Sequence, residues 1–144
     1  MKRYSIDLLL IGAILLTACK SVAAPPPSIE VVGQKVAIDS GYYTDVNDAE
    51  LQTMLSNKDF TFINVHIPFE GNIAKTDLSI AYDQIDQNLD KLPSDKNAKI
   101  VLYCRSGRMS AIAAKTLVGL GYTNIWNLSG GMVAWEQAGL KIDR

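Results

Sequence analysis

The chain has 144 residues, of which 48% are hydrophobic and 20% are charged, and its formal net charge is -1. This length is sufficient for one domain with a substantial core, and no internal repeat is evident. The 14 basic and 15 acidic residues leave no basic surplus that could neutralise phosphates, so the composition argues against a nucleic-acid partner.

The first 18 residues are typical of a signal peptide. Lys2 and Arg3 are followed by an apolar run over residues 8–16 that is too short to span a bilayer. Residues 16–19 read Leu-Thr-Ala-Cys, which resembles the lipobox of bacterial lipoproteins, in which the cysteine is lipidated and becomes the first mature residue. An ordinary signal peptide with an incidental cysteine is the alternative. We therefore predict export and a lipid anchor on Cys19, at the cell envelope, facing the periplasm or at the outer membrane.

A proline-rich segment follows the predicted anchor. The three prolines at 25–27 favour an extended and semi-rigid chain, which suits a tether between a lipid and a folded domain. The acyl chains of a lipoprotein together hold a domain stably at a bilayer, whereas one chain holds it only marginally. The predicted organisation is a signal peptide over 1–18, a lipid anchor and tether over 19–41 and one domain over 42–144.

The first half of this domain alternates between helix and strand patterns. A capping-box spacing predicts one helix, and β-branched and aromatic side chains predict the strand after it. A second helix is indicated by apolar residues at i, i+4 and i+7 and ends before a proline. The predicted segments are a helix from the Asn47–Glu50 capping box to Leu55, a strand over 60–65, a loop over 68–77, a short strand over 79–81 and a helix over 83–92.

The second half continues the alternation. The strand over 99–103 is almost continuously apolar, as in strands buried on both faces of a parallel sheet. Gly121 is placed to end the following helix as a left-handed cap, and Gly130-Gly131 opens the last one. The predicted segments are a strand over 99–103, a helix over 108–120, a strand over 124–128 and a helix over 130–138.

Alternating strands and helices predict an α/β fold. We expect a doubly wound, mostly parallel sheet of about five strands with helices on both faces and right-handed crossovers. In such sheets the ligand site lies outside the carboxyl ends of the strands. Cys104 is the first residue after the strand that we place centrally, so the fold predicts a functional site at this cysteine.

Residues 104–110 read Cys-Arg-Ser-Gly-Arg-Met-Ser. A thiol that faces a helix N-terminus and cationic side chains lies where the thiolate is favoured over the thiol. Gly107 would supply a backbone conformation that a side chain forbids, so that loop amides curl around the sulfur. If Cys19 carries a lipid, Cys104 has no disulfide partner in this chain, and its loop setting then favours a functional role.

Two motifs resemble the rhodanese family of single-domain sulfurtransferases. Residues 104–107 match the family loop, which often reads Cys-Arg-Ser-Gly-x-Arg-Ser. Residues 127–135, with Ala-Gly-Leu at 138–140, are similar to the family's C-terminal segment with its Gly-Gly pair and tryptophan. The resemblance covers about residues 42–142 and implies a rhodanese-like fold.

The resemblance also implies a chemistry. The Cys104 thiolate takes sulfane sulfur from a donor such as thiosulfate, forms a persulfide and passes the sulfur to cyanide or a thiol. No metal or organic cofactor is required. The expected partners are small sulfur-containing anions and thiol or persulfide acceptors, with a redox protein left open. The substrate-binding residues that the family loop implies are Arg105, Ser106, Gly107, Arg108 and Met109.

The chain departs from the family pattern at two places. Asn64-Val65-His66 stands where the family has Asp-Val-Arg, which puts the structural ion pairing there in doubt. His66, the only histidine, either modulates Cys104 and its acceptor or takes over a structural role of the arginine. Met109 stands where the family loop often has arginine, and we expect it to shift donor preference from small inorganic anions toward apolar or protein-bound sulfur sources.

Other readings of the cysteine fit less well. A cysteine phosphatase requires Cys-x5-Arg, but Ser110 stands six places after Cys104. A thioredoxin-type reductase needs a second cysteine at the place of Gly107, and ligands for a structural zinc ion are lacking. The alternative that stays open is a membrane-anchored rhodanese-like module that binds or senses sulfur without turnover.

Overall fold

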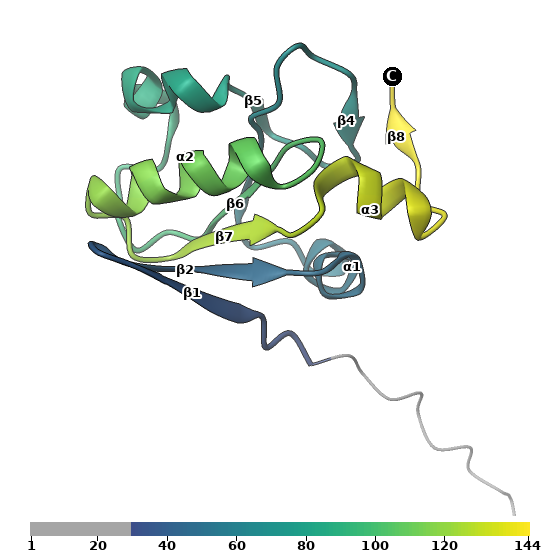
Figure 1. The fold of residues 1–144 in the computed structure, drawn as a ribbon, viewed down its shortest axis with the longest axis horizontal. Helices are drawn as coiled ribbons and strands as arrows, with labels where there is room; N and C mark the ends of the chain where they lie inside the picture. Colours follow the sequence, from purple (N-terminus) through teal and green to yellow (C-terminus); the bar gives the residue numbers. More distant parts are fainter. Residues whose placement is uncertain (1–29) are drawn as a thin grey trace, which may run out of the picture.

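A computed structural model describes residues 30–144, which form a central six-stranded sheet between two layers of helices (Figure 1). The strand order is β1-β2-β7-β6-β3-β5, and only the β1–β2 pair is antiparallel. The strands are β1 (Gln34–Ile38), β2 (Gly41–Val46), β3 (Thr61–Asn64), β5 (Leu78–Ser79), β6 (Ile100–Tyr103) and β7 (Ile125–Leu128). The predicted α/β class with a mostly parallel sheet is confirmed, with six strands in place of about five.

The helices lie on both faces of the sheet, as predicted. Two of them, α1 (Asp48–Ser56) and α3 (Gly131–Gln137), pack on one face. The other two, α2 (Arg108–Gly119) and the 3-10 helix η1 (Tyr82–Lys91), pack on the opposite face. Two separate apolar clusters therefore fill the domain, one on each side of the sheet.

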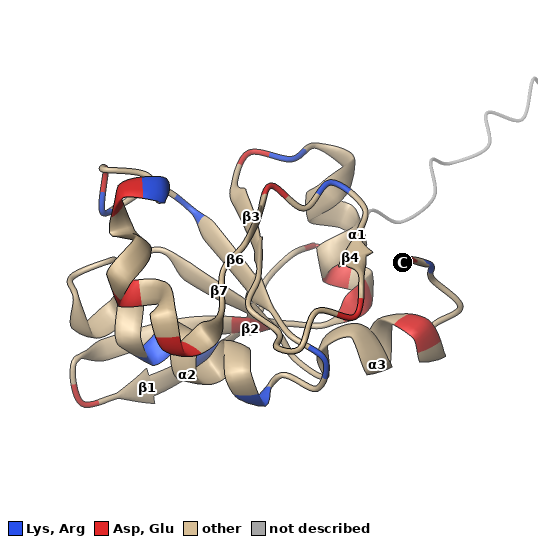
Figure 2. Cartoon of the chain, turned by 90° about the horizontal axis from the view of Figure 1, so that it is seen from above, with Lys and Arg blue, Asp and Glu red and all other residues tan. Residues whose placement is uncertain are grey.

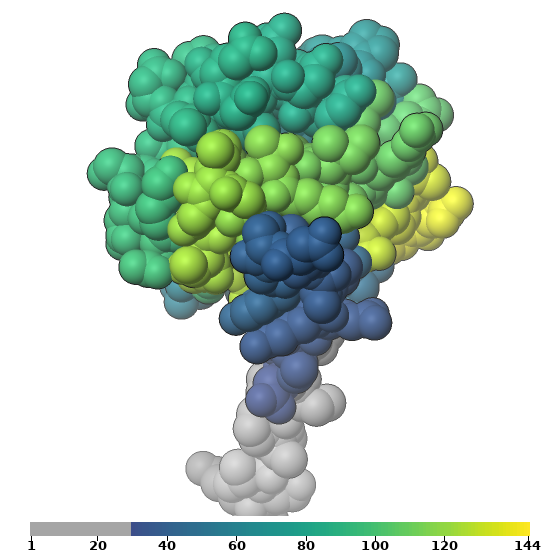
Figure 3. All heavy atoms as spheres, turned by 60° about the vertical axis from the view of Figure 1, so that its left-hand side comes forward, coloured from purple at the N-terminus to yellow at the C-terminus, as the bar shows by residue number. Residues whose placement is uncertain are grey.

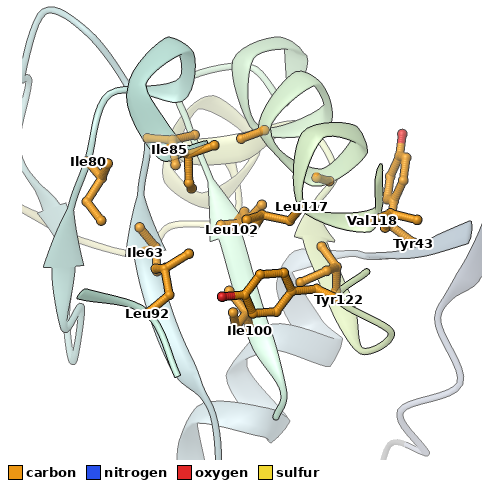
Figure 4. Packing of buried hydrophobic residues seen from close by; sticks show 14 of the residues in the cluster. Tyr43, Ile63, Ile80, Ile85, Leu92, Ile100, Leu102, Leu117, Val118 and Tyr122 are labelled. Carbon is orange, nitrogen blue, oxygen red and sulfur yellow. The ribbon is translucent and has the colours of Figure 1, made fainter. Parts of the chain in front are cut away.

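Strand β6 joins both clusters because successive side chains of a strand point to opposite faces. All four of its residues are buried. Ile100 and Leu102 pack toward α2 and η1, in the cluster that Figure 4 shows, and Val101 and Tyr103 pack toward α1 and α3. This double burial places β6 at the centre of the sheet and Cys104 at the edge where β6 ends.

Local signals in the sequence account for several element boundaries. The predicted capping box is present: the Glu50 amide donates to Asn47 Oδ1 at 2.9 Å, and the Asn47 amide donates to Glu50 Oε2 at 3.1 Å. Gly121, with φ of 89°, follows α2 and donates to the Val118 carbonyl at 3.0 Å, which confirms the predicted left-handed cap.

Two predicted segments differ from the structure. The helix over 83–92 is a 3-10 helix broken at Asn88, whose side chain donates to the Gln84 carbonyl at 2.8 Å and so competes with the backbone. The loop over 68–77 contains β4 (Asn72–Ile73), which pairs with β8 (Ile142–Asp143) near the chain's end. This small sheet was not predicted, because a two-residue strand has no period of its own.

Residues 34–38 lie within the expected tether but form the edge strand β1, paired with β2 from Gln34–Asp45 to Ile38–Gly41. This hairpin (dark blue) lies on the outside of the molecule in Figure 3. In β1 only Val36 and Ile38 are half-buried, and the other three side chains are exposed. The apolar pattern of this strand is therefore weak. The predicted signal peptide and Cys19 lie outside the described residues.

The described surface carries both signs of charge, with basic and acidic positions interspersed around the domain (Figure 2). Between residues 30 and 144 there is no helix with the length and apolar character needed to cross a membrane.

Candidate functional site

The site lies at the carboxyl ends of β3, β6 and β7, where Cys104 follows the central strand. The start of α3 supports its backbone: the Met132 amide donates to the Cys104 carbonyl at 2.9 Å, and the Val133 amide donates to the Arg105 carbonyl at 2.9 Å. Two helices therefore begin beside the cysteine, α2 through the loop that follows it and α3 through these hydrogen bonds. Helix N-termini expose unpaired amides and favour negative charge.

The Cys104 sulfur accepts hydrogen bonds from two groups. The Gly107 amide lies 3.1 Å from Sγ and the Ser110 hydroxyl lies 3.4 Å from it. Cys104 is a free thiol and only 1% exposed. The Ser110 hydroxyl is also 3.1 Å from the Gly107 carbonyl, so its single proton serves either acceptor. Donors aimed at the sulfur stabilise a negative charge there.

Two glycines permit this close packing. Gly107 has φ of 89°, and a Cβ on it would lie 3.1 Å from the Gly130 amide nitrogen. Gly131 has φ of 57°, and a Cβ on it would overlap the Cys104 carbonyl oxygen. The special backbone conformation predicted for Gly107 is present, and Gly130 and Gly131, which were predicted to open the last helix, both have positive φ.

Arg105 is held by a carboxylate from the neighbouring loop. Its Nη1 donates to both Glu70 oxygens, at 2.9 and 2.7 Å, and its side chain is 56% exposed. Desolvation by itself raises the pKa of Glu70, but the hydrogen bond and charge of Arg105, together with His66, outweigh it, and the net pKa lies below the usual value. Glu70 is therefore ionised at neutral pH and the pair is intact.

His66 lies on the other side of Glu70. Its Nε2 is 3.7 Å from Glu70 Oε1, its side chain is 8% exposed, and neither ring nitrogen has a hydrogen-bond partner among the described residues. Its backbone amide donates to Asn64 Oδ1 at 2.9 Å. The structure thus places His66 beside the Glu70–Arg105 pair and shows no hydrogen bond from the imidazole to Cys104.

The other loop residues predicted from the sequence separate into two groups. Ser106 and Arg108 are exposed, and neither side chain forms a hydrogen bond or ion pair with residues 30–144. Met109 is half-buried and packs against the cluster beneath α2. Arg108 is therefore the cation of this loop that stays unpaired within the described part of the chain.

Sequence reasoning missed Glu70 as a partner of the cysteine loop. The only signals were its place four residues after His66 and the short loop that carries both residues. Pairing between β3 and β6 brings that loop to Cys104, since Asn64 is in register with Tyr103. Among residues 30–144, no group of three or more His, Cys, Asp or Glu side chains is placed to hold a metal ion.

The chain is similar to several known proteins over this region. A sulfurtransferase from Allochromatium vinosum is 32% identical over 94 residues, which are 63% of this chain and 85% of that protein. A tRNA uridine(34) hydroxylase from Erwinia tasmaniensis is 28% identical over 107 residues, 70% of this chain but only 30% of that larger protein.

Solved structures agree on the fold. A rhodanese-related protein from Thermoplasma volcanium superposes with a TM-score of 0.60 at 30% identity, covering 69% of this chain and 97% of that one. The profile of the rhodanese-like domain matches residues 45–138, which include the whole cysteine loop and α3. This chain therefore belongs to the rhodanese-like domain family.

Proposed function

We propose that this protein is a sulfurtransferase that carries sulfane sulfur on Cys104. The observation that carries the proposal is the sulfur itself, which accepts hydrogen bonds from the Gly107 amide and the Ser110 hydroxyl at the carboxyl end of a central parallel strand. A nucleophile in this position attacks best as a thiolate, and both donors favour the charged sulfur.

The first step loads the cysteine. The Cys104 thiolate attacks the outer sulfur of a donor, for which thiosulfate is the simplest example. A bond forms between Sγ and that sulfur, the donor's sulfur–sulfur bond breaks, and its electron pair leaves with sulfite. The product is a Cys104 persulfide with one negative charge, and no external oxidant or reductant is used.

The second step transfers the outer sulfur of the Cys104 persulfide to an acceptor. Cyanide or an acceptor thiolate attacks the outer sulfur of the persulfide, the bond to Sγ breaks, and Cys104 leaves as a thiolate. The Gly107 amide and Ser110 hydroxyl then donate to the leaving sulfur, so the same two groups assist both steps. The exposed guanidinium of Arg108 adds a positive charge at the entrance of the loop.

Mass spectrometry of the intact protein tests this function. After exposure to thiosulfate or to an organic thiosulfonate, we expect the protein to gain one sulfur atom, which cyanide removes. Cys104→Ser is the matched control, because it keeps a small polar side chain but provides no thiolate, and it should gain nothing. A protein that gains no sulfur from any sulfane donor would contradict the proposal.

The burial of Cys104 favours a second candidate. A thiol that is 1% exposed could load sulfur yet release it too slowly for turnover, as a sulfur-sensing or sulfur-binding module would. Steady-state formation of thiocyanate from donor and cyanide separates the two. Loading without repeated turnover would identify the module, whereas ping-pong kinetics would identify the enzyme.

We further propose that the protein acts at the cell envelope, held by a lipid on Cys19. The support is the lipobox-like sequence Leu-Thr-Ala-Cys after a short apolar run. In that setting the acceptors are thiols or cyanide available outside the cytoplasm.

A further inference from the structure

The charges around the candidate nucleophile are less favourable to anions than the loop sequence indicates. Of the two arginines in the loop, Arg105 donates to both oxygens of Glu70 at 2.9 and 2.7 Å. This contact uses Nη1 alone and places the guanidinium charge directly against the carboxylate charge, so Arg105 attracts an incoming anion less strongly. The pair as a whole is neutral, so within residues 30–144 Arg108 is the cation of the loop that has no ion-pair partner.

Exposed apolar residues occur in the segments that contact Arg105, next to Glu70 and at the start of α3. Phe69, next to Glu70, is 61% exposed, and Ile67 in the same loop is 38% exposed. In α3, Val133 is 37% exposed, and its amide donates to the Arg105 carbonyl. Among the described residues, the loop and the segments that contact it therefore combine one unpaired cation, Arg108, with a neutral ion pair and exposed apolar side chains.

We propose that Glu70 is a specificity-determining residue: by neutralising Arg105 it makes the site prefer singly charged organic sulfane donors over small dianions such as thiosulfate. This inference rests on the sulfurtransferase function proposed above and names the donor class for it. The apolar substituent of such a donor would lie against the exposed Phe69 and Val133, and its sulfur would face Cys104.

Two donors of nearly equal size measure this preference. Methanethiosulfonate is thiosulfate with one charged oxygen replaced by a methyl group, so it carries one negative charge in place of two. The chemistry is the same for both: the thiolate takes the outer sulfur, and the electron pair of the broken bond leaves with methanesulfinate or with sulfite. A change in the ratio of the two kcat/KM values therefore reports charge recognition and not a change of mechanism.

Glu70→Gln is the informative variant, since it keeps the shape and one acceptor oxygen but frees the charge of Arg105. We expect kcat/KM for thiosulfate to rise about fourfold in 0.1 M salt, and further at lower salt, because one added unit charge acts on a dianion across a screened surface. The rise for methanethiosulfonate should be about half as large on a logarithmic scale, since it bears half the charge.

Asp59→Asn is the matched control. It removes the same charge and frees Lys99, which binds Asp59 at 3.0 Å at the other end of β6. The four residues of β6 lie between Lys99 and Cys104, and these five steps along the strand span about 16 Å at ~3.3 Å per residue, which exceeds the Debye length of ~10 Å in 0.1 M salt. This variant should leave the donor ratio unchanged.

A second background shows whether the effect passes through Arg105. In the Arg105→Gln protein, adding Glu70→Gln should no longer raise the thiosulfate-to-methanethiosulfonate ratio, because no guanidinium is left to free. An increase that survives in this background would overturn the proposal, and so would an unchanged ratio in Glu70→Gln alone. Absence of sulfur loading from either donor would instead overturn the sulfurtransferase function and this inference together.

Discussion

Tyr103 shows how one residue couples the core to the loops of the site. Its ring is buried in the cluster beneath α1 and α3, 4.7 Å from the Phe62 ring centroid. Its hydroxyl accepts from the Ile73 amide at 3.0 Å, lies 2.8 Å from Thr76 Oγ1 and donates to Asn72 Oδ1 at 3.2 Å. The residue before Cys104 thus fixes the loop that follows β3, including the small sheet at β4.

Tyr103→Phe is expected to destabilise the protein by about 1–3 kcal/mol, because the Ile73 amide is left buried without an acceptor. Burial raises the pKa of Tyr103 above its ordinary value of 10.0, with Asp143 adding to the shift and hydrogen bonds from Thr76 and Ile73 opposing it. The stability that depends on its neutral hydroxyl is complete below pH ~10 and decreases as the pH rises toward the folded-state pKa.

The measurement is denaturant unfolding of both proteins at several pH values. The difference in free energy of unfolding between wild type and Tyr103→Phe should be constant from neutral pH to about pH 9. It should become smaller above pH ~10, since the variant has no phenol that ionises at this position. Tyr43, whose pKa burial and Asp45 also raise, is present in both proteins and cancels. If the difference in free energy of unfolding stays constant through pH 11, the neutral hydroxyl of Tyr103 is not the group that stabilises the protein.

At the level of secondary structure, the turn from β7 into α3 supports the backbone of the cysteine loop. Gly130 and Gly131 both have positive φ, and the first amides of α3 donate to the carbonyls of Cys104 and Arg105. The helix has only seven residues and little stability of its own. Its place is set by Trp135, which is 5% exposed and donates from its ring to the Lys141 carbonyl at 3.1 Å.

Gly131→Ala should therefore perturb the site more than an ordinary glycine substitution. A left-handed conformation costs an alanine about 1–2 kcal/mol, and here the Cβ would also overlap the Cys104 carbonyl oxygen. Gly139→Ala is the matched control, since Gly139 has φ of 81° but open space around the added atom. Equal losses of stability and of sulfur loading in the two variants would show that the turn does not support the loop.

At the scale of the whole molecule, the chain combines two cysteines with separate expected roles. Cys104 lies in the folded domain, and Cys19 lies in the segment outside the described residues. The first described strand, β1, is at the edge of the sheet, so a tether preceding it would leave the domain at a surface position (Figure 1).

Cys19→Ala should abolish incorporation of labelled fatty acid and should move the protein from the membrane to the soluble fraction. Acyl chains are expected to be the main membrane attachment, because a soluble domain without them has only weak affinity for a bilayer. Cys104→Ala should keep the lipid and lose sulfur loading. Fatty-acid labelling that persists in Cys19→Ala would exclude the lipobox interpretation.

The α/β class, the central buried strand and the cysteine loop could all be predicted from the amino-acid sequence. These features are local or periodic: a run of apolar residues over 100–103, a capping box at Asn47, and a glycine in the loop where φ must be positive. Each constrains the backbone through residues close in the chain, and so each can be recognised without knowing what packs against it.

The contacts that the cysteine loop makes with distant residues depend on the tertiary structure. Glu70 reaches Arg105 because strands β3 and β6 pair in register, and no spacing between positions 70 and 105 encodes that contact. The same holds for the edge strand β1, whose half-exposed residues gain a structure only by pairing with β2. Long-range pairing depends on the whole sheet, and for that reason the charge balance around Cys104 could not be predicted from the loop's own residues.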